Sequence, residues 1–132
     1  MSIEKNKQLA REFIDALVRA DIQAIQDSFA PDGVCWTAGT MPISGTHTRA
    51  ELADAARGVL GVFPEGLKFT IKNLTAEDDR VAIEAESYGR HRSGKIYANQ
   101  YHFLMRVRDG KITEWREYLD TMHANDVLCG AG

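Results

Sequence analysis

The clearest alternation of apolar and polar residues runs from Lys95 to Asp120, in the last third of the chain. It predicts two long strands joined by a tight turn at Arg108-Asp109-Gly110-Lys111, because Asp-Gly between alternating apolar runs favours a hairpin. Strand residues of the same parity share a face. One face of the first strand carries Tyr97, Asn99, Tyr101, Phe103 and Met105, and one face of the second carries Trp115, Glu117 and Leu119. Polar groups among aromatic ones on one face predict a pocket wall rather than plain core.

Two more strands are predicted before this hairpin, over residues 67–75 and 80–91. The second places Val81, Ile83 and Ala85 on one face and Ala82, Glu84, Glu86 and Tyr88 on the other. Two glutamates on one face indicate either a solvated surface or the lining of a polar pocket. If Glu84, Glu86 and Glu117 share a cavity, they cannot all ionise cheaply. One of them should then have a raised pKa that suits a general acid or base.

Helical spacing dominates the beginning of the chain. Ser2 can cap a helix whose apolar positions recur through residues 3–17. Asp21 is expected to cap a second, short helix that extends to Phe29 and is stopped by Pro31-Asp32-Gly33. These two helices give the N-terminal part an apolar side that needs a partner surface.

The middle of the chain mixes short signals. A β-branched and aromatic stretch over residues 34–37 predicts a strand, and residues 40–48 lack a clear period and are expected to form a loop. Thr48, followed three residues later by Glu51, forms a capping box that opens a third helix. A last helical turn is expected over residues 121–128.

The predicted order is helix, helix, strand, helix and then four long strands. This order is typical of an α+β fold rather than of alternating βαβ units. An antiparallel sheet of this length must curl or have one face covered, and the helices are available to cover it. A length of 132 residues predicts a single domain over 1–132, with a cavity between helices and sheet.

Composition and charge limit the kinds of molecule that the protein is expected to bind. The hydrophobic share of 44% and charged share of 27% are those of an ordinary soluble globular protein. A net charge of −3 without a basic run argues against nucleic acid or an anionic membrane as partner. No apolar run approaches a membrane span, and M-S-I-E-K-N-K-Q lacks the apolar core of a signal peptide. With only Cys35 and Cys129 as cysteines, we expect a reduced, cytoplasmic protein.

The four histidines are scattered without metal-ligand spacing, so neither a metal nor a cofactor is expected. His102 alternates out of the pocket face, and we expect it at the surface or in a dimer interface. His47 lies before the third helix and could sit at the pocket mouth.

The order of elements and the run S-G-K-I-Y-A-N-Q-Y-H-F-L-M-R-V-R-D-G-K-I-T-E-W-R-E-Y-L-D-T resemble the NTF2-like superfamily. They resemble most closely its SnoaL-like, ketosteroid-isomerase-related branch, over about residues 6–128. The resemblance implies a cone-shaped fold, in which a curved, mostly antiparallel sheet wraps around the N-terminal helices with an internal pocket. It also implies a homodimer through the outer sheet face. It does not imply one activity, because the scaffold hosts isomerases, hydrolases, cyclases and non-catalytic modules.

Steroid isomerases of this branch carry a Tyr on the first helix, an Asp general base on the first strand and an Asp oxyanion donor in the later sheet. The matching positions here are Phe13, Thr37 and Tyr101. The base is therefore absent, because a hydroxyl without a carboxylate partner cannot take a proton from carbon near neutral pH. Tyr101 could still polarise a carbonyl, but a standard ketosteroid isomerase is not expected.

Glu117 is the strongest catalytic candidate. The resemblance places it where SnoaL-like cyclases carry an acid/base Asp, and where limonene-epoxide-hydrolase-like proteins carry a carboxylate in W-R-D-Y-x-D. The Arg-x-Asp of that second group falls at Glu84-x-Glu86, so its bridging Arg is lost and like charges would repel. The alternative for Glu117 is a structural salt bridge to Arg106 or Arg116, or exposure at an edge.

We therefore expect a small apolar ligand in the pocket, and two classes of function remain open. The first is a cofactor-free acid–base enzyme (isomerase, hydrolase or cyclase) acting on an apolar, oxygen-bearing substrate. The second is a non-catalytic ligand-binding or dimerisation module. The expected catalytic residues are Glu117, Glu86 and Tyr101. The expected ligand-binding residues are Phe13, Trp36, Thr37, Glu84, Tyr97, Asn99, Phe103 and Trp115.

Overall fold

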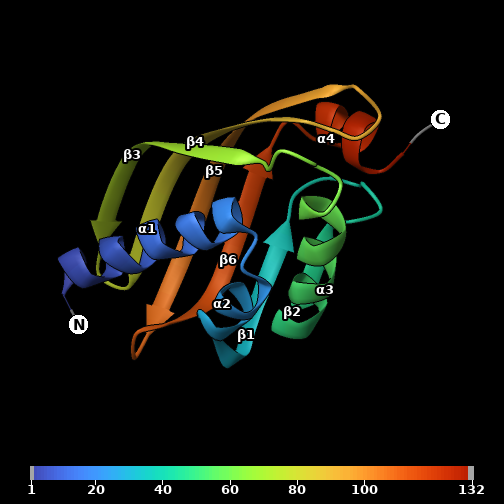
Figure 1. The fold of residues 1–132 in the computed structure, drawn as a ribbon. Coiled ribbons are helices and arrows are strands. Elements are labelled where there is room, and N and C mark those ends of the chain that lie inside the picture. Colours follow the sequence, from blue (N-terminus) through green and yellow to red (C-terminus); the bar gives the residue numbers. More distant parts are fainter. Residues whose placement is uncertain (1, 131–132) are drawn as a thin grey trace.

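The computed structural model describes residues 2–130, in which six strands form one curved sheet in the order β2-β1-β6-β5-β4-β3 (Figure 1). Neighbouring strands are antiparallel except for β1 and β6, which are parallel. The strands are β1 (Phe29–Thr37), β2 (Gly45–Thr48), β3 (Lys68–Glu77), β4 (Arg80–Arg90), β5 (Ile96–Arg108) and β6 (Lys111–Leu119). The predicted α+β class and the curved, mostly antiparallel sheet are confirmed.

The helices of the described chain cover one face and both ends of the sheet (Figure 1). They are α1 (Ile3–Arg19), α2 (Ile22–Asp27), α3 (Arg49–Leu60) and α4 (Thr121–Leu128). Helix α1 lies across the inner face of the sheet, α2 and α3 lie beside β1 and β2, and α4 lies at the far end of β5. The result is a cone whose interior lies between sheet and helices. No helix within residues 2–130 is long and apolar enough to cross a membrane.

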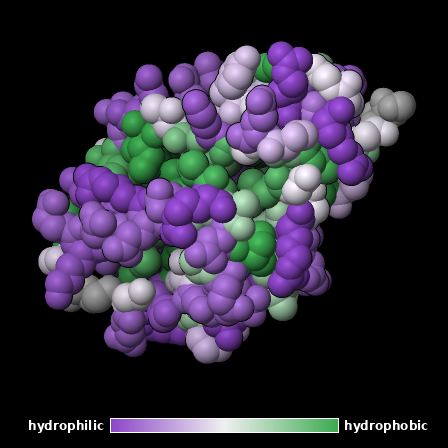
Figure 2. Space-filling view, in the orientation of Figure 1, coloured by the Kyte–Doolittle hydropathy of each residue, from purple (hydrophilic) through white to green (hydrophobic). Residues whose placement is uncertain are grey.

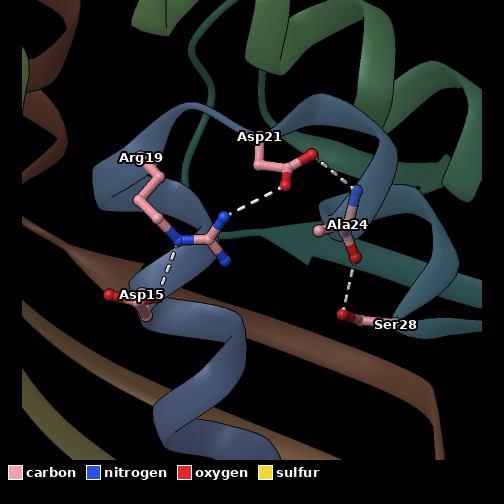
Figure 3. Close-up of polar contacts among 5 residues, drawn as sticks. All are labelled: Asp15, Arg19, Asp21, Ala24 and Ser28. Atoms are coloured by element: carbon pink, nitrogen blue, oxygen red, sulfur yellow. Dashed lines mark hydrogen bonds and ion pairs between the residues drawn. The ribbon is translucent and has the colours of Figure 1, made fainter.

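The junction between α1 and α2 is held by polar contacts (Figure 3). Arg19 donates to Asp15 on its own helix at 2.7 Å and to Asp21 at 3.1 Å. The other oxygen of Asp21 accepts from the backbone N–H of Ala24 at 3.1 Å, which is the expected N-cap of α2. Ser28 donates to the Ala24 carbonyl at 2.7 Å. This partly exposed cluster fixes the bend that turns the chain from α1 into β1.

Two local predictions are confirmed in detail. Thr48 and Glu51 form both hydrogen bonds of a capping box at the start of α3. The β5–β6 turn has positive φ at Asp109 (52°) and Gly110 (76°), as expected for a hairpin turn that matches the twist of its strands. Both features fix the elements that carry the cavity walls.

The first strand is longer than expected. Helix α2 ends at Asp27, and β1 already begins at Phe29, so Pro31-Asp32-Gly33 lies inside the strand as an irregularity instead of ending a helix. Gly33 is required there, because a Cβ at this position would meet the Ile112 carbonyl oxygen at 2.6 Å. The expected loop over residues 40–48 also ends in a short strand, β2, which pairs with β1.

A register shift in β6 sets the inner face of the sheet. Ile112 pairs with Val107 and Glu114 with Arg106, which leaves Thr113 as the extra residue. As a result, Ile112 and Trp115 both face the core although their parity differs. The Trp115 ring is fully buried, with ring centroids at 4.5 Å from Phe13 and 4.7 Å from Phe103. This aromatic cluster packs against one side of the cavity described below, and Phe103 is part of the cavity lining.

Candidate functional site

A cavity of about 300 Å³ lies between α3, the C-terminal end of α1 and the inner face of the sheet. Its lining is mostly apolar, and apolar side chains reach the surface between α1, the start of β3 and α3 (Figure 2). The polar groups that line it come mainly from the sheet. They are Cys35 and Thr37 on β1, Tyr97 and Tyr101 on β5, Glu117 on β6, and His47 and Glu51 at the β2–α3 junction.

Glu117 lines this cavity from the middle of the inner sheet face. Its cross-strand partners are Thr37 on β1 and Phe103 on β5. Burial raises the pKa of Glu117 to about 7, partly offset by the indole N–H of Trp115, which donates to its Oε1 at 3.1 Å. A carboxyl group with such a pKa is populated in both protonation states near neutral pH.

Glu117 does not form the salt bridge to Arg106 or Arg116 that was the alternative to a functional role. Arg106 and Arg116 pair instead with Glu114, at 3.3 and 3.4 Å, on the outer side of the sheet. Within residues 2–130, no Lys, Arg or His nitrogen lies within ion-pair distance of Glu117. Glu117 is therefore not held in a structural ion pair by the residues that the structure describes.

A chain of hydroxyl and amide groups adjoins the cavity, with Tyr97 and Tyr101 in its wall and Ser87 and Asn99 buried behind them. The hydroxyls of Ser87 and Tyr101 lie 2.8 Å apart, and Tyr101 donates to the Tyr97 hydroxyl at 2.9 Å. The amide of Asn99 donates to the same Tyr97 oxygen at 3.0 Å. Burial is the main reason that the pKa of both tyrosines lies above the ordinary value, so both remain protonated at neutral pH.

The cavity lining also includes His47, which was expected at the pocket mouth, and two groups that the sequence does not predict there, Cys35 and Glu51. Cys35 lies next to Thr37 on the inner face of β1, and burial, with a smaller effect from the Glu117 charge, raises the pKa of its thiol well above the ordinary range. His47 contacts the Ile43 carbonyl at 3.0 Å, and the exposed Glu51 marks where the cavity meets solvent. Parity could have predicted Cys35 in the cavity wall, because Cys35 and Thr37 share one face of the strand and Trp36 lies on the other.

Three predicted site residues, Glu84, Glu86 and Trp36, lie on the opposite face of the sheet and do not line this cavity. Glu84 and Glu86 are exposed, whereas Val81, Ile83 and Ala85 of the same strand are buried. The three carboxylates expected in one cavity therefore do not converge. Trp36 likewise points outward, where the Arg116 guanidinium lies 3.9 Å from its ring centroid. The physical reason is the pairing of Ile83 with Phe103 and of Ala85 with Tyr101, because directly opposed residues share a face.

Glu86 instead belongs to an open hollow of about 410 Å³ on the outer sheet face. Lys68, Tyr88, Gln100 and Asp120 also line it, and Lys72 approaches Glu86 at 3.9 Å. This hollow is more open to solvent than the cavity between the helices and the sheet, and a larger share of its lining is polar. The cavity that contains Glu117 is therefore the stronger candidate site.

The remaining predicted residues divide between the cavity wall and its support. Thr37, Tyr97, Tyr101, Phe103 and Glu117 line the cavity. The other three, Phe13, Asn99 and Trp115, are buried just behind that wall. Among residues 2–130, no group of three or more His, Cys, Asp or Glu side chains could hold a metal ion.

The fold and the enclosed, sheet-lined cavity define an NTF2-like α+β protein. The chain belongs to the SnoaL-like domain family, which it matches over residues 10–115. Among curated proteins, none matches the chain.

Solved structures agree with this family. AclR from Streptomyces galilaeus, a proposed hydroxylase, is 23% identical, with a TM-score of 0.80 over 99% of this chain and 89% of AclR. An NTF2-like protein from Burkholderia xenovorans LB400 is 26% identical, with a TM-score of 0.77 over 97% and 98% of the two chains. A proposed SnoaL-like polyketide cyclase from Jannaschia sp. CCS1 is 17% identical, with a TM-score of 0.79 over 100% and 97%.

Proposed function

We propose that this SnoaL-like protein binds a small, apolar, oxygen-bearing molecule in its internal cavity and acts on it as a cofactor-free acid–base enzyme of the isomerase, hydrolase or cyclase class. The observation that carries the proposal is Glu117, a carboxyl group in a mostly apolar cavity with a pKa of about 7. A group whose pKa lies near the working pH is best suited to both accept and donate a proton.

The neighbourhood of Glu117 supports proton transfer to a bound molecule. The Trp115 indole holds one carboxyl oxygen, which fixes the orientation of the group and leaves the second oxygen for the ligand. Phe103 and Leu119 supply apolar wall on the same face, so a ligand would displace water from around the carboxyl. Similar folds include a proposed hydroxylase and a proposed polyketide cyclase, so small-molecule chemistry on this scaffold has precedent, although fold alone does not select the reaction.

The proposal can be tested by following deuterium exchange at the methyl group of 2-acetylnaphthalene in heavy water by NMR. Removal of a proton next to a carbonyl is an elementary step that isomerisation and cyclisation share. We expect exchange above the buffer rate for the wild type, its loss in Glu117→Gln, and its retention in Glu84→Gln, which removes a carboxylate from the outer face. Exchange that persists unchanged in Glu117→Gln would contradict the assignment of Glu117.

The second candidate function is a non-catalytic ligand-binding module. It is favoured by the lining of the cavity, in which Glu51 is the one other carboxylate among residues 2–130 and lies exposed on α3 rather than on the inner sheet face. Tight binding of the same ketone without exchange by the wild type would support this alternative over the enzyme.

We also propose that the protein forms a homodimer through the outer sheet face. This face presents Trp36, Arg116 and Tyr118 in contact with one another, and Tyr88 is 57% exposed nearby in sheet order. Sedimentation should give twice the chain mass of 14.7 kDa. Tyr118→Glu should yield a monomer, whereas Met122→Glu, on the exposed side of α4, should not. A monomeric wild type would contradict this arrangement.

We propose a cytoplasmic location as well, because Cys35 and Cys129 are both free thiols. Fractionation of the producing cells would test it, and recovery outside the cytoplasm would contradict it.

A further inference from the structure

The orientation of the Asn99 amide is fixed by its surroundings. Its oxygen accepts two backbone N–H groups, from Gln100 at 2.7 Å and from Asp120 at 3.0 Å. Only an oxygen can accept from both, so the other end of the amide must be the NH₂ group. Its two protons go to the Tyr97 hydroxyl and to the Asp120 carbonyl, each at 3.0 Å. Both amide protons and the amide oxygen of Asn99 therefore have partners, and towards Tyr97 the amide can only donate.

The proton of Tyr101 is also committed. Tyr101 donates to the Tyr97 oxygen at 2.9 Å. Because a phenol has a single proton, the 2.8 Å contact between Ser87 and Tyr101 must have Ser87 as its donor. The chain of donors therefore runs in one direction, from Ser87 through Tyr101 to Tyr97.

Tyr97 lies at the end of both donor series. Its oxygen accepts from Tyr101 and from Asn99, which occupies both acceptor sites of a phenol. Its own proton has no acceptor among residues 2–130, although the ring is buried and lines the cavity. A buried donor without a partner is costly and calls for one. Two incoming hydrogen bonds also polarise the remaining O–H and make it a stronger donor.

We infer that Tyr97, rather than Tyr101, is the hydrogen-bond donor for the ligand, and that it receives a neutral acceptor oxygen such as a ketone or ester carbonyl. The inference rests on the proposed function of the cavity and adds the chemistry of the ligand to it. Tyr101 and Asn99 are then positioning residues, which aim the Tyr97 proton by occupying its oxygen.

The electrostatics of the cavity select among acceptor oxygens. Glu117 lines the same cavity, and its charge and that of Asp120 act on Tyr97. An anionic carboxylate ligand would face these charges, and among residues 2–130 no Lys or Arg lines the cavity to offset them, so a neutral carbonyl fits better. The second wall of the cavity, made by α3 and the end of α1, is apolar and would hold the hydrocarbon part.

The test compares two probes of nearly the same shape, 2-acetylnaphthalene and 2-ethylnaphthalene, by titration calorimetry. Only the first has an acceptor oxygen, and the second would bury the Tyr97 proton without a partner. We expect the wild type to prefer the ketone by about tenfold, as expected for one buried hydrogen bond. The carbonyl stretch of the bound ketone should also move to lower frequency.

Two conservative variants separate the tyrosines. Tyr101→Phe leaves the Tyr97 proton in place but removes one of the two groups that aim it, so it should reduce the preference by about threefold, whereas Tyr97→Phe should lose most of it. Affinity for 2-ethylnaphthalene serves as the check that each cavity is intact. A preference abolished by Tyr101→Phe, or left at the wild-type level by Tyr97→Phe, would overturn the assignment.

The two probes also distinguish this inference from the function on which it rests. If the wild type binds both probes equally, the Tyr97 assignment fails while ligand binding in the cavity stands. If the wild type binds neither, the proposed function fails and the Tyr97 assignment falls with it.

Discussion

Replacing Glu117 by Gln should make the protein more stable, and the gain should depend on pH. Gln has nearly the same shape, can still accept from the Trp115 indole and never ionises. In the wild type, burial raises the pKa of Glu117 from an ordinary value of 4.5 to about 7. At about 1.36 kcal/mol for each pKa unit, the difference between these values corresponds to about 3 kcal/mol.

The sign follows from proton counts. Below pH 4.5, the ordinary pKa of a glutamate, Glu117 is protonated in both the folded and the unfolded chain. Its ionisation then does not change the free energy of unfolding. Between pH 4.5 and about 7 the unfolded chain has released the proton and the folded chain still holds it, so stability falls as pH rises. Above about pH 7 both chains have released the proton, and the loss of stability has reached its full size. Glu117→Gln removes this loss, so its advantage should grow across that window and then level off.

The assay is urea unfolding of wild type and Glu117→Gln from about pH 5 to about pH 8. Taking the difference between the two proteins cancels the titration of the histidines, which both contain. Glu84→Gln is the matched control, because Glu84 is exposed on the outer face of the neighbouring strand β4, and its curve should run parallel to that of the wild type. A difference between Glu117→Gln and wild type that stays constant across this range would refute the burial argument.

Three further predictions follow from the same structure. Trp115→Phe should raise the pKa of Glu117 further in an NMR titration, because it removes the indole hydrogen bond that lowers it, and an unchanged value would count against the indole contact. Thr48→Ala should cost about 1 kcal/mol in urea unfolding, because Glu51 alone cannot complete the capping box, and a neutral effect would show that α3 needs no cap. Gly110→Ala should cost roughly 1 kcal/mol, since the position has φ of 76° but open space for a Cβ, and Gly110→Asn should cost less.

Much of the sheet could be predicted because parity and turn chemistry are local. The Asp109-Gly110 turn predicts the hairpin, and parity groups Tyr97 with Tyr101 on one face of β5. Glu117 joins that face only because Thr113 shifts the register by one residue and pairs Glu117 with Phe103. Parity fails where an extra residue enters a strand. Pro31-Asp32-Gly33 predicts the end of a helix, but the same residues form the irregularity inside β1, because Pro and Gly interrupt strands as well as helices.

The choice of face on β4 could not be made from that strand alone. Both of its faces contain residues compatible with a pocket wall, so Glu84 and Glu86 were assigned to the cavity. The decisive information is cross-strand, since Ala85 lies opposite Tyr101 and Ser87 opposite Asn99. Trp36 was expected to bind ligand, but it alternates with Cys35 and Thr37, which face the cavity, and therefore lies on the outer face.

The central claim is that Glu117 is a carboxyl group poised to exchange a proton inside an apolar cavity. The most direct test is an NMR titration of the glutamate side-chain carboxyl carbons in ¹³C-labelled protein, with the Glu117 signal assigned from its absence in Glu117→Gln. The account predicts a titration midpoint near pH 7 for this signal. A midpoint near the ordinary value of 4.5 would contradict it.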